Sequence, residues 1–336
     1  MERSVSLDTK TILPVLRKPD LPDGSRSTQM KRFVGDYGII LFFVLIVALL
    51  AFTAPNFFTI DNLISVVRQS SIIGIIALGM TFVMITAGID LSVGSVVGVA
   101  GLVFAMLAPR DGTALIVPLI AGMAVGLLVG FLSSALIVWG KLLPFLATLA
   151  TMAIARTAAL VITEGQVVSG LSGPAEWLGS GFVGPIPVPV IIFFALALVC
   201  EFVLSRTKFG SHVYAVGGNE ESAKKVGISV TRVLFTVYLI GGVMAAIGGV
   251  VLTARLNGAA PVAGTGYELQ VIAAVVIGGT SLFGGVGTIR GTVLGVLLLG
   301  VVMNGMNLLG VSSYYQQGMQ GVILVLAVLL NRWKSD

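Results

Sequence analysis

The sequence predicts an all-α protein that crosses a membrane about ten times. Of its 336 residues, 56% are hydrophobic and only 10% are charged, and its mean hydropathy is +1.04. Soluble domains usually carry about 25% charged residues, so this composition is typical of membrane proteins. The 43 glycines agree with that class, because small residues let membrane helices approach each other closely.

Ten apolar segments are candidates for spanning helices, each of which needs about 20 mostly apolar residues. Five precede and five follow the segment Thr163–Val188, and the shorter ones must borrow flanking residues. The ten are Gly38–Thr53, Ile64–Thr86, Leu91–Leu107, Ala114–Trp139, Pro144–Ile162, Pro189–Leu204, Arg232–Ala254, Leu269–Leu282, Gly291–Leu309 and Gly318–Leu330. The eighth ends in a glycine cluster, which favours a half-helix or a re-entrant segment.

The charges set the expected topology. Residues 1–36 are polar and lack the apolar core and cleavage site of a secretory signal, so we expect a disordered cytoplasmic tail before a transmembrane domain at 37–333. With the N-terminus inside, sixteen of the twenty Lys and Arg residues fall on the cytoplasmic side. The positive-inside rule therefore predicts that both ends are cytoplasmic.

Two arginines fall within or near predicted spans, where a charge costs at least about 2.5–3.5 kcal/mol. Arg68 lies one turn into its span, so we expect it to reach the outer interface. Arg156 lies deeper and is expected to face protein or a watery cavity rather than lipid.

The longest cytoplasmic loop, residues 205–231, holds a predicted short helix. Asn219 is suited to cap its start, and Gly227 stands where a C-terminal glycine belongs. Acidic residues follow Asn219 and lysines precede Gly227, so the charges complement the helix dipole. This pattern fits either an ordinary capped loop at the membrane surface or a handle for a soluble partner.

A second polar feature interrupts the apolar runs between Gly79 and Ser95. Asp90 is positioned to cap the following helix, and we prefer that interpretation. Alternatively, Ser92 and Ser95 face a polar path, since broken helices line cavities in many transporters.

Three motifs in this chain resemble the permease subunit of ribose-type ABC sugar importers. They are Gly79-Met80-Thr81 with Asp90-Leu91-Ser92-Val93-Gly94-Ser95, Gly217-Gly218-Asn219-Glu220-Glu221-Ser222-Ala223, and the run from Ala274 to Gly285. The resemblance covers about Tyr37 to Trp333. It implies a permease of the bacterial inner membrane with the ten-helix type II importer architecture.

The resemblance also implies partners: a cytoplasmic ABC ATPase, a periplasmic sugar-binding protein and a second permease subunit. In such permeases the loop before the seventh helix carries the coupling helix that docks into the ATPase. The matching positions are Gly218, Asn219, Glu220, Glu221, Ala223, Lys224 and Gly227. We therefore interpret this loop as the ATPase-coupling loop.

The chain has no nucleotide site of its own, since no Gly-x-x-x-x-Gly-Lys-[Ser/Thr] motif occurs. ATP and Mg²⁺ are expected on the partner ATPase, and we expect no cofactor, metal or catalytic residue here. One Cys and one His leave little for such chemistry, and the charges form no basic face for nucleic acid. Candidates for the sugar path are Asp90, Ser92, Ser95, Asn304 and Asn307, and hydrogen bonding between helices is the alternative role for such side chains.

The predicted function is thus ATP-driven import of a monosaccharide by alternating access, with a ribose-like pentose, a hexose or a polyol as solute. An ion-coupled secondary transporter is the alternative, although it would require intramembrane acids, and only Asp90 and Glu268 approach that description. An intramembrane enzyme is disfavoured by the scarcity of titratable groups. The sequence names neither the sugar nor the choice between a homodimer and a heterodimer of permeases.

Overall fold

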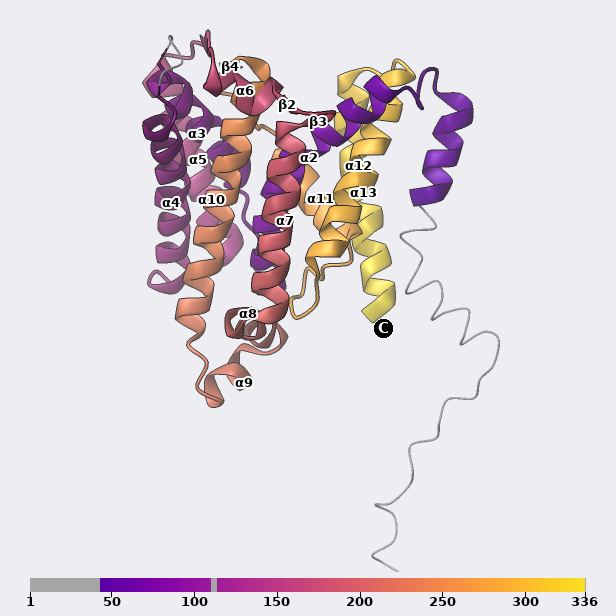
Figure 1. Ribbon diagram of the computed structural model, residues 1–336. Coiled ribbons are helices and arrows are strands. Elements are labelled where there is room, and N and C mark those ends of the chain that lie inside the picture. The colour runs from indigo at the N-terminus through magenta and orange to yellow at the C-terminus, as the bar shows by residue number, and fades with distance from the viewer. Residues whose placement is uncertain (1–42, 110–113, 336) are drawn as a thin grey trace, which may run out of the picture. The chain divides into compact units, whose positions relative to one another are not determined.

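The computed structural model of the chain describes residues 43–109 and 114–335, with side chains up to residue 329 (Figure 1). The predicted tail, residues 1–36, lies outside this part. Most of what is described is helical, as the composition predicts.

The helices follow the predicted segments closely. In chain order they are Phe43–Thr53, α2 (Ile60–Ile85), α3 (Val93–Leu107), α4 (Ile116–Val138), α5 (Pro144–Thr163), α6 (Pro174–Ser180), α7 (Val188–Arg206), α8 (Lys208–Gly218), α9 (Glu220–Lys225), α10 (Val230–Leu256), α11 (Tyr267–Ile277), α12 (Ile289–Leu308) and α13 (Ser313–Ser335). Each of the ten predicted apolar segments overlaps one of these helices, and several of the helices extend beyond the predicted bounds.

Within the described residues, six helices are long and apolar enough to cross a membrane: α2, α4, α5, α7, α10 and α12. Three further apolar helices are shorter, namely Phe43–Thr53, α3 and α11. The eleven residues of α11 match the expected half-helix, because the chain leaves the helix at Gly278 and turns at Gly279, whose φ is +91°. The structure thus supports a membrane protein with many spans, while the total of ten remains a prediction.

Glycines bring α4 against α10. Gly122, Gly126 and Gly130 recur every four residues and therefore share one face of α4. A methyl group added at Gly126 would overlap the carbonyl oxygen of Gly242 on α10, and one at Gly130 would lie 2.6 Å from the carbonyl oxygen of Tyr238. The two backbones are therefore in direct contact, as in other membrane helix pairs with small residues at the interface.

Short strands lie at one end of this helical body and α8 and α9 at the other (Figure 1). β1 (Val168–Ser169) pairs antiparallel with β4 (Gly258–Ala259), and β2 (Phe182–Val183) pairs with β3 (Ile186–Pro187) as a hairpin. Together with α6 they organise the segment that the sequence left as a long connection.

The expected cap at Asp90 is wrong in detail. α3 begins at Val93, so Ser92 occupies the N-cap position, and its side chain makes no capping hydrogen bond. Asp90 lies two residues earlier, where its Oδ1 accepts hydrogen bonds from the backbone N–H of Ser92 at 2.9 Å and from Ser92 Oγ at 2.6 Å. The carboxylate therefore closes a local turn, a competing use of aspartate beside its capping role.

Candidate functional site

The connection between α7 and α10 folds as two short helices, α8 and α9, that differ in exposure. Gly210, Val213 and Val216 are buried on α8, whereas Ala223 is the buried residue of α9. α7 ends at Arg206 and α10 begins at Val230, close to the predicted loop bounds of 205 and 231. The capping pattern predicts α9, whereas α8 has no such signal in the sequence.

The capping chemistry of α9 agrees with the sequence-based expectation. Asn219 Oδ1 accepts a hydrogen bond from the backbone N–H of Ser222 at 2.7 Å, and Lys224 Nζ lies 2.6 Å from Glu220 Oε1 one turn away. Gly227 has a φ of +84° and follows the C-cap residue, where a left-handed glycine ends a helix. These contacts hold six residues helical although so short a helix is marginal in isolation.

α9 presents its side chains to the surroundings. Ala223 is 2% exposed and fixes the helix to the body, while the side chains of Glu220 and Lys224 are 54% and 58% exposed. Beside them Val226 is 75% exposed, an apolar side chain on an otherwise polar tip. An exposed apolar residue surrounded by charges suits contact with another protein.

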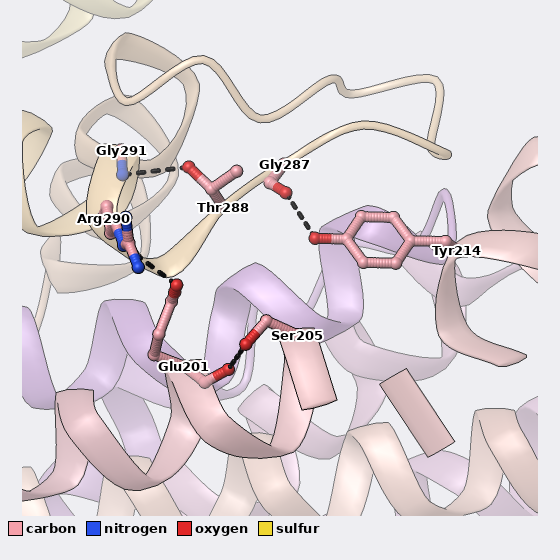
Figure 2. A network of polar contacts seen from close by, with 7 residues as sticks. All are labelled: Glu201, Ser205, Tyr214, Gly287, Thr288, Arg290 and Gly291. Carbon is pink, nitrogen blue, oxygen red and sulfur yellow. Dashed lines mark hydrogen bonds and ion pairs between the residues drawn. The ribbon is translucent and has the colours of Figure 1, made fainter. Parts of the chain in front are cut away.

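α8 is held to the residues before α12 by a contact that the sequence does not indicate. Tyr214 Oη donates a hydrogen bond to the carbonyl oxygen of Gly287 at 2.7 Å, and Arg290 Nε lies 3.0 Å from Glu201 Oε1 nearby (Figure 2). Burial, and then the charge of Glu201, raises the pKa of Tyr214, so its hydroxyl stays protonated and donates. The partners lie 73 residues apart, and no local pattern indicates such a pair.

Three of the predicted path residues lie at the α2–α3 junction. Asp90, Ser92 and Ser95 are each 1% exposed. Asp90 and Ser92 bond to each other, while Asp90 Oδ2 and Ser95 Oγ have no hydrogen-bond partner among the described residues. This junction therefore contains buried polar atoms whose hydrogen-bonding capacity is not met by the described residues.

The other two lie on α12 and are already paired. The amides of Asn304 and Asn62 exchange hydrogen bonds of 2.7 and 3.0 Å, and Asn307 Oδ1 accepts one from Gln316 at 2.7 Å. Asn62 lies near the start of α2, whereas Asp90 follows its end. With a rise of about 1.5 Å per residue, the two groups of predicted path residues are about 35 Å apart along α2. They form no single cluster.

Arg68 and Arg156, the two arginines expected within or near spans, both contact other parts of the chain. Arg156 Nη1 donates to the carbonyl oxygens of Pro261 at 3.0 Å and Ala263 at 2.9 Å, which confirms that it faces protein. The guanidinium carbon of Arg68 lies 4.8 Å from the centroid of the Phe182 ring in the β2–β3 hairpin, at the end of the body opposite α9 (Figure 1). This cation–π contact gives the long side chain a partner outside the apolar part of its helix.

Comparison with known proteins places these features in a family. A sequence profile described as the permease component of branched-chain amino acid transport systems matches residues 62–328. The ribose import permease protein RbsC of Escherichia coli (strain K12) is 42% identical over 296 residues, which cover 87% of this chain and 92% of the relative. RbsC of Bacillus subtilis (strain 168) is 43% identical over 301 residues, 89% of this chain and 93% of the relative.

A third relative is named for a different sugar. The D-allose transport system permease protein AlsC of Escherichia coli (strain K12) is 39% identical over 302 residues, 89% of this chain and 92% of the relative. No solved structure matches the chain. The extent and identity of these matches, together with the multi-span helical fold, show that the chain belongs to the family of ribose-type ABC import permeases.

Proposed function

We propose that this chain is the membrane-spanning subunit of an ATP-driven monosaccharide importer in the bacterial inner membrane. Relatives named for ribose and allose, both at about 40% identity over most of the chain, support a monosaccharide as the solute. Ribose is the first sugar to test, and the allose relative makes a hexose the second.

The coupling role is carried by one observation: α9 is capped at its start, exposed along its length and separated from α8 by a single residue, Asn219. A partner protein can bind such a helix without unfolding the membrane helices to which it is attached. We propose that α9 docks into a separate cytoplasmic ABC ATPase as the centre of a coupling loop formed by Gly218, Asn219, Glu220, Glu221, Ala223, Lys224 and Gly227, in which the buried Ala223 holds the helix against the body. That ATPase would bind ATP and Mg²⁺, and the chain described here would hydrolyse nothing.

We further propose ten membrane crossings in the type II importer arrangement, with both termini in the cytoplasm. Six helices have the necessary length, and the shorter apolar helices supply the remainder together with α13. A second permease subunit would complete the pore, and a periplasmic sugar-binding protein would deliver the solute to the end that carries β1–β4.

For the path we propose contacts at two depths. Asp90, Ser92 and Ser95 would meet sugar hydroxyls at the α2–α3 junction, and Asn304 and Asn307 would meet them near the other end of α2. Amide and hydroxyl groups suit a neutral sugar, because they can replace its water partners without binding it tightly. The unpartnered oxygens of Asp90 and Ser95 support the first group.

Transport in vesicles tests this function. The chain is reconstituted with its cognate ATPase, ATP is enclosed with the ATPase, and the cognate binding protein is added outside with labelled ribose or allose. We expect accumulation of one sugar that requires both ATP and the binding protein. Accumulation driven by a proton or sodium gradient without ATP would overturn the proposal and favour the ion-coupled alternative.

A further inference from the structure

We propose that the contacts joining α8 to the end of α2 and to the start of α12 form a joint that carries movement of α9 into the membrane helices, with Tyr214 as its positioning residue. This inference rests on the proposed coupling role of α9. It assigns a function to residues that are not among the seven predicted coupling positions: Ile85, Glu201, Tyr214, Gly217, Gly285, Gly287 and Arg290. We call this set the α8 joint.

The connection between α8 and α9 is short and rigid. α8 ends at Gly218 and α9 begins at Glu220, so Asn219 is the whole connection. Asn219 is also the N-cap of α9, and its backbone N–H donates to the carbonyl oxygen of Ala215 on α8 at 3.1 Å. A displacement of α9 therefore reaches α8 with little slack.

Backbone contacts connect α8 to α2 and to the loop before α12. The N–H of Gly285 donates to the carbonyl oxygen of Ile85, the last residue of α2, at 2.8 Å. Gly217 of α8 packs against both groups so closely that an added methyl would overlap the Ile85 oxygen and lie 2.7 Å from Gly285 N. Three segments thus meet without intervening side chains, so none can move far without displacing the others.

Tyr214 extends this contact to α12. Its hydroxyl holds the carbonyl oxygen of Gly287, and the next residue, Thr288, is the N-cap of α12. Thr288 Oγ1 accepts a hydrogen bond from the N–H of Gly291 at 3.0 Å (Figure 2). A displacement of Tyr214 would therefore be passed to Gly287, which is adjacent to the N-cap residue of α12.

The joint also has room to change. A hollow of about 270 Å³ lies between α7, α8 and the start of α12, lined by Glu201, Leu204, Ser205, Tyr214, Thr288 and Arg290. The Arg290–Glu201 pair belongs to this lining, and with the Arg290 side chain 84% exposed it is a weak attachment that can break and reform. A close-packed contact on one side and a hollow on the other suit a part that transmits movement.

Tyr214→Phe tests the joint with little change in packing, because it removes only the hydroxyl that holds Gly287. The complete transporter is assayed for sugar uptake and for ATP hydrolysis stimulated by the loaded binding protein. Since one net hydrogen bond is worth about 1 kcal/mol, its loss weakens this contact about fivefold, and we expect a rise of up to about fivefold in the ATP hydrolysed per sugar imported. Ser205→Ala is the matched control: its hydroxyl lines the same hollow but donates only to the Glu201 carbonyl oxygen within α7.

A charge exchange provides a second test. Glu201→Arg alone should raise the ratio of ATP hydrolysed to sugar imported, and adding Arg290→Glu should lower it again by restoring an opposite pair. If wild type imports sugar and both Tyr214→Phe and the single reversal keep its ratio, the joint is refuted while the proposed function stands. If wild type imports no sugar, the proposed function itself fails.

Discussion

One added methyl group at Gly88 tests how the turn after α2 packs on α10. A Cβ built there overlaps Tyr238 Oη, whereas its next contacts, with Val83 Cγ1 and Val83 O, are at 3.2 Å. Gly88 is not among the glycines with positive φ, so the expected strain comes from the overlap rather than from the backbone. Gly88→Ala therefore introduces a single dominant clash, with one oxygen atom.

The expected cost follows from that clash. Overpacking a closely packed interior typically costs about 1–3 kcal/mol. Tyr238→Phe removes the oxygen concerned, which is buried and has no hydrogen-bond partner among the described residues, so by itself it should be neutral or stabilising by about 1 kcal/mol. The double variant should regain most of the stability lost in Gly88→Ala, with a coupling of about 1–2 kcal/mol between the two sites.

Thermal unfolding of the purified protein in detergent measures this cycle. Each kcal/mol moves the midpoint by about 2–4 °C in chains of this order of size, so Gly88→Ala should lower it by about 5 °C and the added Tyr238→Phe should restore it. Gly321→Ala is the control, because an added methyl there meets nothing within 4 Å. Strictly additive effects would show that Tyr238 does not face Gly88 and would refute the described packing.

Three further predictions concern the coupling region. Reversing Glu220 and Glu221 together to Lys should abolish uptake while membrane insertion is unchanged, because the first-turn charges would then oppose the dipole and the Lys224 contact would be lost; normal uptake would contradict the coupling role. Asn219→Ala should cost α9 about 1 kcal/mol and lower uptake several-fold, whereas Asn219→Asp should preserve uptake because it keeps an accepting oxygen for Ser222. Tyr214 has a pKa in the folded protein above its unfolded value of about 10, so the stability that its hydroxyl contributes should persist below pH 10 and disappear as the pH rises through the folded pKa. The difference in 295 nm absorbance between wild type and Tyr214→Phe should therefore increase only above pH 10.

Local chemistry was predictable from the sequence where it involves near neighbours. The cap at Asn219, the glycine stop at Gly227 and the short apolar helix that became α11 all depend on residues within a few positions of each other. Asp90 shows how easily such a local prediction fails, because a shift of two residues along the chain separates an N-cap from a carboxylate that closes a turn. Both roles use the same acceptor and the same kind of backbone donor.

Long-range contacts could not be predicted in the same way. Tyr214 meets Gly287, Asn62 meets Asn304, and Gly88 meets Tyr238, each across a large part of the chain. None of these pairs leaves a periodic or compositional sign, because in an apolar bundle many hydroxyls and amides have suitable spacing. The predicted path residues were chosen by residue type and local position, neither of which indicates which helices pack together, and this explains why they fall at opposite ends of α2.

The two ends of α9 are connected differently to the membrane helices, and the difference indicates which helices should move with α9. Toward α8 the single capping residue Asn219 makes the connection, whereas toward α10 residues 226–229 intervene, among them the left-handed Gly227. α10 is also held to α4 by the glycine contacts of Gly126 and Gly130, which cannot be stretched without separating two backbones. Movement of α9 should therefore be taken up at Gly227 on the α10 side and passed on through α8 to α2 and α12, while α4 and α10 stay together.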